Sequence, residues 1–119
     1  MNKQILENAG IDCGECLKHF MNDERLFSAV LSAFANDSVF ERARAAYRNG
    51  DMAELRETAH EAKGSSGSAN ITGVYNPASE LVLLLRRDSF TQAEVDEAFK
   101  RFDDAYTAAQ IAILAALKE

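Results

Sequence analysis

The sequence predicts an all-α protein, and three observations support this fold class. The chain of 119 residues has six Gly and one Pro, so few residues interrupt regular structure. Its apolar residues recur every three or four positions, which is the period of a helix, and no segment alternates convincingly as a strand does. Capping residues precede several of these periodic segments. The length is that of one domain, so we expect residues 1–119 to form a single helical domain.

The first predicted helix is short. Asp12 is a suitable N-cap and Glu15 stands three residues later, as in a capping box, so this helix should extend to about Met21. Asn22 or Asp23 then caps a longer helix. Its apolar positions lie on one face: Leu26, Phe27, Val30, Leu31 and Phe34. Residues 36–38 mark a kink or break, after which Phe40, Ala43 and Tyr47 continue the pattern.

The clearest junction is Asn49-Gly50-Asp51. Gly50 can take the left-handed conformation that ends a helix, while Asp51 can cap the next helix with Glu54 completing a second box. We expect this third main segment to remain helical through the Gly/Ser tract to about residue 69. The reason is a face of mostly small residues at three- and four-residue steps: Leu55, Ala59, Ala62, Ser66 and Ala69.

Two further helices complete the prediction. Asn76 is interpreted as an N-cap followed by Pro77 at the first helical position, and this helix should end at residues 86–87. It carries Leu81, Leu84 and Leu85. Thr91 and Glu94 form a third capping box that opens a long last helix. Its apolar seam comprises Val95, Phe99, Phe102, Tyr106, Ala109, Ile113 and Ala116. The architecture expected is an up-down antiparallel four-helix bundle with a short additional N-terminal helix.

Charge and hydropathy exclude several classes of protein. The net charge of −6 and a pI near 4.9 argue against a nucleic-acid-binding surface, which needs clustered Lys and Arg. No apolar run approaches the roughly 18 residues of a membrane span, and residues 1–10 lack the apolar stretch of a signal peptide. We therefore expect a cytoplasmic protein without membrane association. The initiating Met1 favours a free-standing protein over a fragment of a larger one.

Residues 59–70, AHEAKGSSGSAN, are the most informative segment for function. Gly64 and Gly67 together weaken a helix by roughly 2 kcal/mol, so something must offset their presence. On a helix, His60, Lys63, Gly64 and Gly67 form one strip of imidazole, ammonium and bare backbone. An imidazole of ordinary pKa, about 6.5, is a good nucleophile near neutral pH. A neighbouring ammonium would stabilise a phosphoryl group attached to it.

Residues 59–67 resemble the A-H-x-x-K-G-[SA]-[SA] signature of histidine-containing phosphotransfer (HPt) domains, and the similarity extends over nearly the whole chain. The resemblance implies that His60 is the phosphoacceptor, Lys63 a phosphate-stabilising cation, and Gly64 with Gly67 the surface that admits a partner. Two departures are Asn70, where Gly is usual, and Pro77 within a normally helical segment. Asn can take the same left-handed conformation as Gly.

The same resemblance implies a role in a multistep two-component phosphorelay. His60 would accept a phosphoryl group from an aspartate of a response-regulator receiver domain and pass it to another receiver, with a hybrid sensor histidine kinase upstream. Mg²⁺ would be held by the receiver, and this chain would need no cofactor or metal of its own. We expect the protein to be a monomer. We also expect that it is not an enzyme, because the sequence has no ATP-binding loop. Arg56, one turn before His60, is a further candidate for receiver contact.

Other interpretations remain open at this stage. An HPt-like module could dock receivers without efficient transfer. Glu57 and His60 match the Glu-x-x-His pair of di-iron bundles, although a second copy is missing. Cys13, Cys16 and His19 could be part of a zinc or redox site, but the sequence supplies no convincing fourth ligand. Packed thiols are the preferred interpretation of the two cysteines.

Overall fold

The computed structural model describes residues 1–118, and within them every regular element is an α-helix, which confirms the all-α prediction. The helices are α1 (Lys3–Asn8), α2 (Cys13–His19), α3 (Glu24–Ala35), α4 (Val39–Arg48), α5 (Met52–Ser68), α6 (Thr72–Leu85) and α7 (Gln92–Leu117). In this part of the chain, no helix combines the length and the apolar character needed to cross a membrane.

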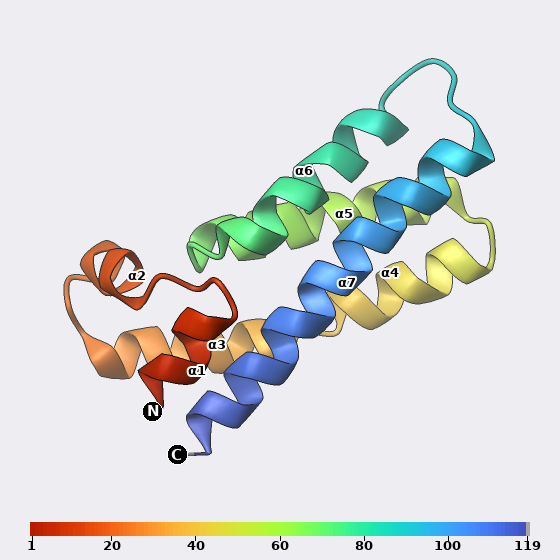
Figure 1. The fold of residues 1–119 in the computed structure, drawn as a ribbon. Coiled ribbons are helices and arrows are strands. Elements are labelled where there is room, and N and C mark those ends of the chain that lie inside the picture. The colour runs from red at the N-terminus through yellow and green to blue at the C-terminus, as the bar shows by residue number, and fades with distance from the viewer. Residues whose placement is uncertain (119) are drawn as a thin grey trace.

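The four helices α4, α5, α6 and α7 pack around one another. Helix α5 contacts α4 and α6, α6 contacts α7, and α7 contacts α4 (Figure 1). Helix α7 extends past α4 to pack on α3 and α1, so the molecule is elongated, with principal extents of 43 × 22 × 21 Å. The N-terminal segment closes one end of the molecule, where the amide of Asn2 donates to the carbonyl of Ala116 at 2.9 Å.

The apolar seam predicted for the last helix lies in the hydrophobic core. All seven of its positions, from Val95 to Ala116, are buried. Aromatic rings from three helices meet there, with Phe34 of α3 and Phe40 of α4 packing on Tyr106 of α7. The small-residue face of α5 is buried as well, which allows α4 and α6 to approach its backbone closely. On α3, Leu26 differs from the expectation, because 44% of it is exposed.

The predicted helix boundaries are correct where a specific cap determines them. Gly50 has a φ of +68° at the end of α4, and the carboxylate of Asp51 accepts the amide of Glu54 at 3.1 Å. Asp12 likewise accepts the amide of Glu15. Among residues 1–118, the reciprocal bond of a full capping box is present only at Thr91, whose amide donates to Glu94 at 3.0 Å.

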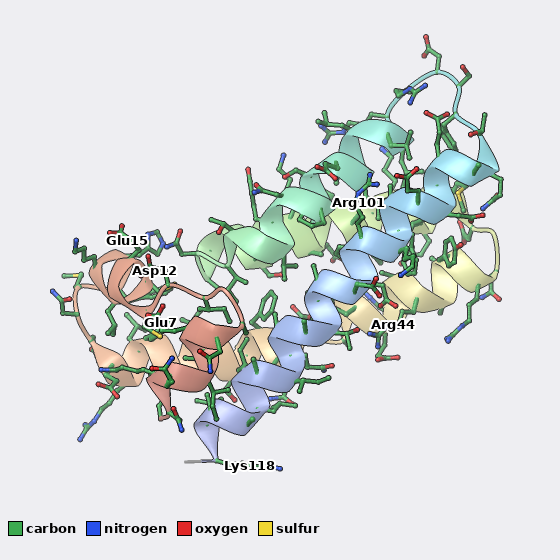
Figure 2. The ribbon with its side chains drawn as sticks, in the orientation of Figure 1. Glu7, Asp12, Glu15, Arg44, Arg101 and Lys118 are labelled. Atoms are coloured by element: carbon green, nitrogen blue, oxygen red, sulfur yellow. The ribbon has the colours of Figure 1, made fainter. Side chains whose placement is uncertain are left out.

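The N-terminal prediction was incomplete. Residues 3–8 form an additional helix, α1, whose Leu6 is fully buried. Glu7 of α1 accepts the amide of Cys13 at 2.9 Å and thereby joins α1 to α2; both segments are seen at one end of the molecule in Figure 2. Helix α2 ends at His19 because Met21 and Asn22 adopt left-handed conformations, with φ of +57° and +60°. Residues 36–38 form a complete break between α3 and α4.

The predicted start of the helix at Pro77 was wrong. Helix α6 begins at Thr72, and Pro77 lies inside it. The physical reason is packing: Val74, Ala78 and Leu81 share one buried face, so extending the helix upstream of the proline buries additional apolar surface. A proline at this position removes one hydrogen bond, the one that would reach the carbonyl of Gly73. Gly73 is exposed, so solvent can satisfy that carbonyl.

Candidate functional site

Helix α5 presents the predicted site residues as one accessible strip. The helix continues through the Gly/Ser tract to Ser68, as expected, with Ala69 as its C-cap. His60 and Gly64 are exposed, and Lys63 and Gly67 are half-buried. Within residues 1–118, no other side chain makes a hydrogen bond or ion pair with the imidazole of His60. The imidazole is therefore open to solvent.

The serines of this segment have structural partners within the helix. The hydroxyl of Ser66 is buried and donates to the carbonyl of Ala62 at 2.7 Å, and that of Ser65 donates to the same carbonyl at 3.3 Å. Back-bonding of this kind allows a hydroxyl to be buried without losing its hydrogen bond. Ser66 therefore packs in the core, as expected for a member of the small-residue face of α5.

His60 lines an open depression of about 510 Å³ that three helices form. Helix α5 supplies His60, Lys63, Gly64, Gly67 and Ser68, α2 supplies His19, and α6 supplies Tyr75. Neither His19 nor Tyr75 was predicted from the sequence to belong to this site. No local pattern connects either of them to His60, because they arrive from different helices. The one available signal for Tyr75 was Gly67, since a glycine inside a helix often marks a close neighbour.

The two glycines of α5 differ in their surroundings. A Cβ atom added to Gly64 would meet nothing within 4 Å, so the protein itself gives no packing reason for a glycine there. A Cβ atom on Gly67 would lie 3.2 Å from Cδ2 and Cε2 of Tyr75. Gly67 therefore has an intramolecular role, which is to let the Tyr75 ring approach the helix. Gly64 leaves bare backbone next to His60.

Lys63 is the cation nearest to His60 along this strip. Its Nζ lies 5.9 Å from the centroid of the Tyr75 ring. Nowhere in residues 1–118 does a carboxylate form an ion pair with Lys63. By contrast Glu61, the carboxylate that follows His60, is paired with Arg42 of α4. The positive charge of Lys63 thus remains available for an anion in the depression.

Arg56 is exposed one helical turn before His60, but it does not line the depression. Its contact with a receiver remains a prediction.

We compared the chain with models of known protein families, with curated proteins and with solved structures. None of them matches it. The functional interpretation therefore depends on the motif at residues 59–67 and on the geometry of the depression.

The di-iron interpretation does not agree with where the relevant side chains lie. Glu57 and His60 are both exposed on the outer face of α5, whereas the carboxylates and histidines of such centres project into the bundle. In the described part of the chain, no three or more His, Cys, Asp or Glu side chains are grouped in a way that could hold a metal ion.

The two cysteines are buried and are not joined by a disulfide, and His19 is exposed at the depression. Burial raises the pKa of the Cys13 thiol to about 11, and the nearby carboxylate of Glu7 acts in the same direction. Burial also raises the pKa of Cys16, whose Sγ lies 3.5 Å from the carbonyl oxygen of Asn70. Thiols of this kind remain protonated near neutral pH, and they behave as packing groups.

Proposed function

We propose that this protein is a histidine phosphocarrier of the HPt type, with His60 as the phosphoacceptor. It would work in the cytoplasm as a monomer, between receiver domains of a multistep phosphorelay that a hybrid sensor histidine kinase supplies. The observation that carries the proposal is the combination at one depression of an exposed imidazole, a half-buried ammonium without a carboxylate partner, and bare backbone at Gly64.

We regard α4, α5, α6 and α7 as the core of an up-down four-helix bundle, with α3 continuing the line of α4 along α7. The closed series of contacts from α4 through α5, α6 and α7 back to α4 supports this assignment. In such a bundle the phosphoacceptor helix has one face in the core and the other in solvent, as α5 does.

The proposed transfer needs little from this chain beyond a nucleophile and a cation. A nitrogen lone pair of neutral His60 attacks the phosphorus of the receiver's aspartyl phosphate. The N–P bond forms as the P–O bond to the aspartate breaks, and the carboxylate leaves. The ring proton on the other nitrogen can then pass to solvent. Lys63 offsets the charge of the phosphoryl oxygens, and the Mg²⁺ expected on the receiver would do so from the opposite side. Transfer to a second receiver is the reverse of these steps.

The decisive experiment follows label from phosphorylated receiver domains to the purified protein. We expect an acid-labile, alkali-stable label that is lost in His60→Gln. The matched control is His19→Gln, because His19 is the only other histidine and lines the same depression. Label that persists in His60→Gln and disappears in His19→Gln would move the phosphoacceptor to α2. Receiver binding without any label would favour the docking module over the carrier.

Two further variants test the assigned roles of Lys63 and Gly64. Lys63→Ala should slow transfer or shorten the lifetime of the phosphohistidine, because the phosphoryl oxygens lose their neighbouring cation. Gly64→Leu should weaken receiver binding and leave the fold intact, since the new side chain would project into open space. Unchanged affinity for receivers in Gly64→Leu would remove this explanation of the glycine.

A further inference from the structure

The ring of Tyr75 packs against helix α5 at Gly67, which has no side chain. Its ring edge lies so close to Gly67 that a Cβ atom there would be 3.2 Å from two ring carbons. The ring is half-buried and projects from α6 into the depression that also contains His60 and Lys63. Because both helices are packed together along their length, the ring has a defined position relative to α5.

The same ring is the neighbour of the Lys63 ammonium, at 5.9 Å from Nζ to the ring centroid. This distance is within the range in which an ammonium is attracted to an aromatic face. A lysine side chain has a flexible four-carbon stem, and ordering it around an anion costs conformational entropy. Since no carboxylate in residues 1–118 pairs with Lys63, the Tyr75 ring is the group that restricts where the ammonium lies.

We propose that Tyr75 is a positioning residue that holds the Lys63 ammonium at the depression beside His60, with Gly67 providing the space for its ring. The proposal rests on the phosphocarrier function, because Lys63 matters chemically only when an anion is bound there. It assigns Gly67 to internal packing that acts through Tyr75 and Lys63, and it leaves Gly64 as the glycine exposed to the partner.

The contact between the two side chains can be tested without any phosphotransfer. In wild-type protein, the ε-methylene protons of Lys63 should show an upfield ring-current shift in the NMR spectrum. Tyr75→Phe keeps the ring and should keep the shift, whereas Tyr75→Leu should lose it. A Lys63 shift that is the same in Tyr75→Leu as in wild type would overturn the proposal. Gly67→Ala is a milder test, because it displaces the ring without removing it, and it should reduce the shift.

The functional consequence is tested on the lifetime of phosphohistidine formed with phosphoramidate, a small-molecule phosphoryl donor. His19→Gln is used as the background, so that His60 is the only histidine. Tyr75→Leu should shorten the lifetime about two- to fivefold, the range expected for one exposed cation–π contact, and Tyr75→Phe should leave it nearly unchanged. In a Lys63→Ala background, Tyr75→Leu should have no additional effect.

An equally large effect of Tyr75→Leu with and without Lys63 would show that Tyr75 acts by another route, and the proposal would be wrong. The unfolding midpoints of the variants show whether a shorter phosphohistidine lifetime comes from misfolding. If Tyr75→Leu does not fold, the lifetimes in Gly67→Ala and Tyr75→Phe are compared instead. Because this assay uses no receiver, its result is separate from the carrier function. The wild-type protein could take no label from receivers while Tyr75→Leu still shortens the phosphohistidine lifetime only when Lys63 is present. This result would contradict the carrier function and support the positioning role of Tyr75.

Discussion

Among single residues, the two glycines of α5 should respond oppositely to the same substitution. Gly64→Ala places a methyl group in open space within a helix, so we expect the free energy of unfolding to rise by about 1 kcal/mol. Gly67→Ala brings its methyl group against Tyr75, and the displaced ring should cancel most of that gain. Urea denaturation of the two variants and wild type measures the difference. An equal gain in both would show that the Tyr75 ring moves away at no cost.

The Cys13 thiol should make the protein less stable at alkaline pH. Its pKa is raised from 9.0 to about 11 by burial, so the unfolded chain releases this proton at a lower pH than the folded one. The contribution of the neutral thiol is therefore complete below pH 9 and is lost as the pH rises toward 11. The slope for this one group is at most about 1.4 kcal/mol per pH unit. Urea unfolding between pH 8 and 11 measures it.

Cys13→Ala is the control for this pH dependence. Burial also raises the pKa of Tyr106, to about 12, and that group titrates in both proteins. The difference between the two slopes then belongs to Cys13. A variant whose stability falls with pH as steeply as the wild type does would assign the alkaline loss to other groups.

Among the helices, the two N-caps Thr91 and Ser38 make a matched pair. The hydroxyl of Thr91 accepts the amide of Glu94 at 3.1 Å and Glu94 bonds back to Thr91, whereas Ser38 makes no side-chain capping bond at the start of α4. Thr91→Ala should therefore lower the free energy of unfolding by about 1 kcal/mol. Ser38→Ala should change it by only a few tenths. Thermal or urea unfolding provides both values, and equal losses would contradict the assigned role of the box.

The elements that the sequence predicted well are those whose signals are local. The limits of α5 follow from Gly50, Asp51 and a continuous small-residue face, and the course of α7 follows from the Thr91 box and its seam. Helix α1 was missed because six residues with one buried side chain carry little periodicity, and its position depends on contacts with α7. Pro77 misled the prediction because proline is common at the first position of a helix. In this helix the burial of Val74 outweighs that preference, and α6 begins five residues earlier, at Thr72.

The residues of the candidate site also differ in whether a local sequence signal could predict them. His60, Lys63 and Gly64 were predictable because their spacing on one helix determines which residues share a face. His19 and Tyr75 were not, because they reach the depression from α2 and α6, and only the packing of three helices brings them together. The packing of Gly67 against Tyr75 was not predictable for the same reason, since Tyr75 belongs to another helix.

For the whole molecule, Arg44 makes several polar contacts between α4 and α7, in addition to the hydrogen bond from Tyr47 to Asp96. Arg44 is labelled in Figure 2. Its guanidinium donates to Asp103 at 2.7 Å and to Thr107 at 2.8 Å, both on α7, and to Glu41 at 2.8 Å. It also lies 5.7 Å from the Tyr106 ring. Arg101 is a second link of this kind, because it bonds Glu80 of α6 at 3.3 Å and Glu97 of its own helix at 2.8 Å.

The two arginines differ chiefly in exposure, and this difference predicts unequal contributions to stability. The Arg44 side chain is 24% exposed and that of Arg101 is 49% exposed. Arg44→Ala leaves the partly buried Asp103 without its partner, and we expect a loss of about 1–2 kcal/mol in the free energy of unfolding. Arg101→Ala removes ion pairs that water largely screens, and the loss should be below about 0.5 kcal/mol. Urea unfolding of both variants at low and high salt measures these losses, and salt should reduce only the smaller one. Equal losses, or a loss in Arg44→Ala that salt abolishes, would contradict the role assigned to Arg44 in holding α4 against α7.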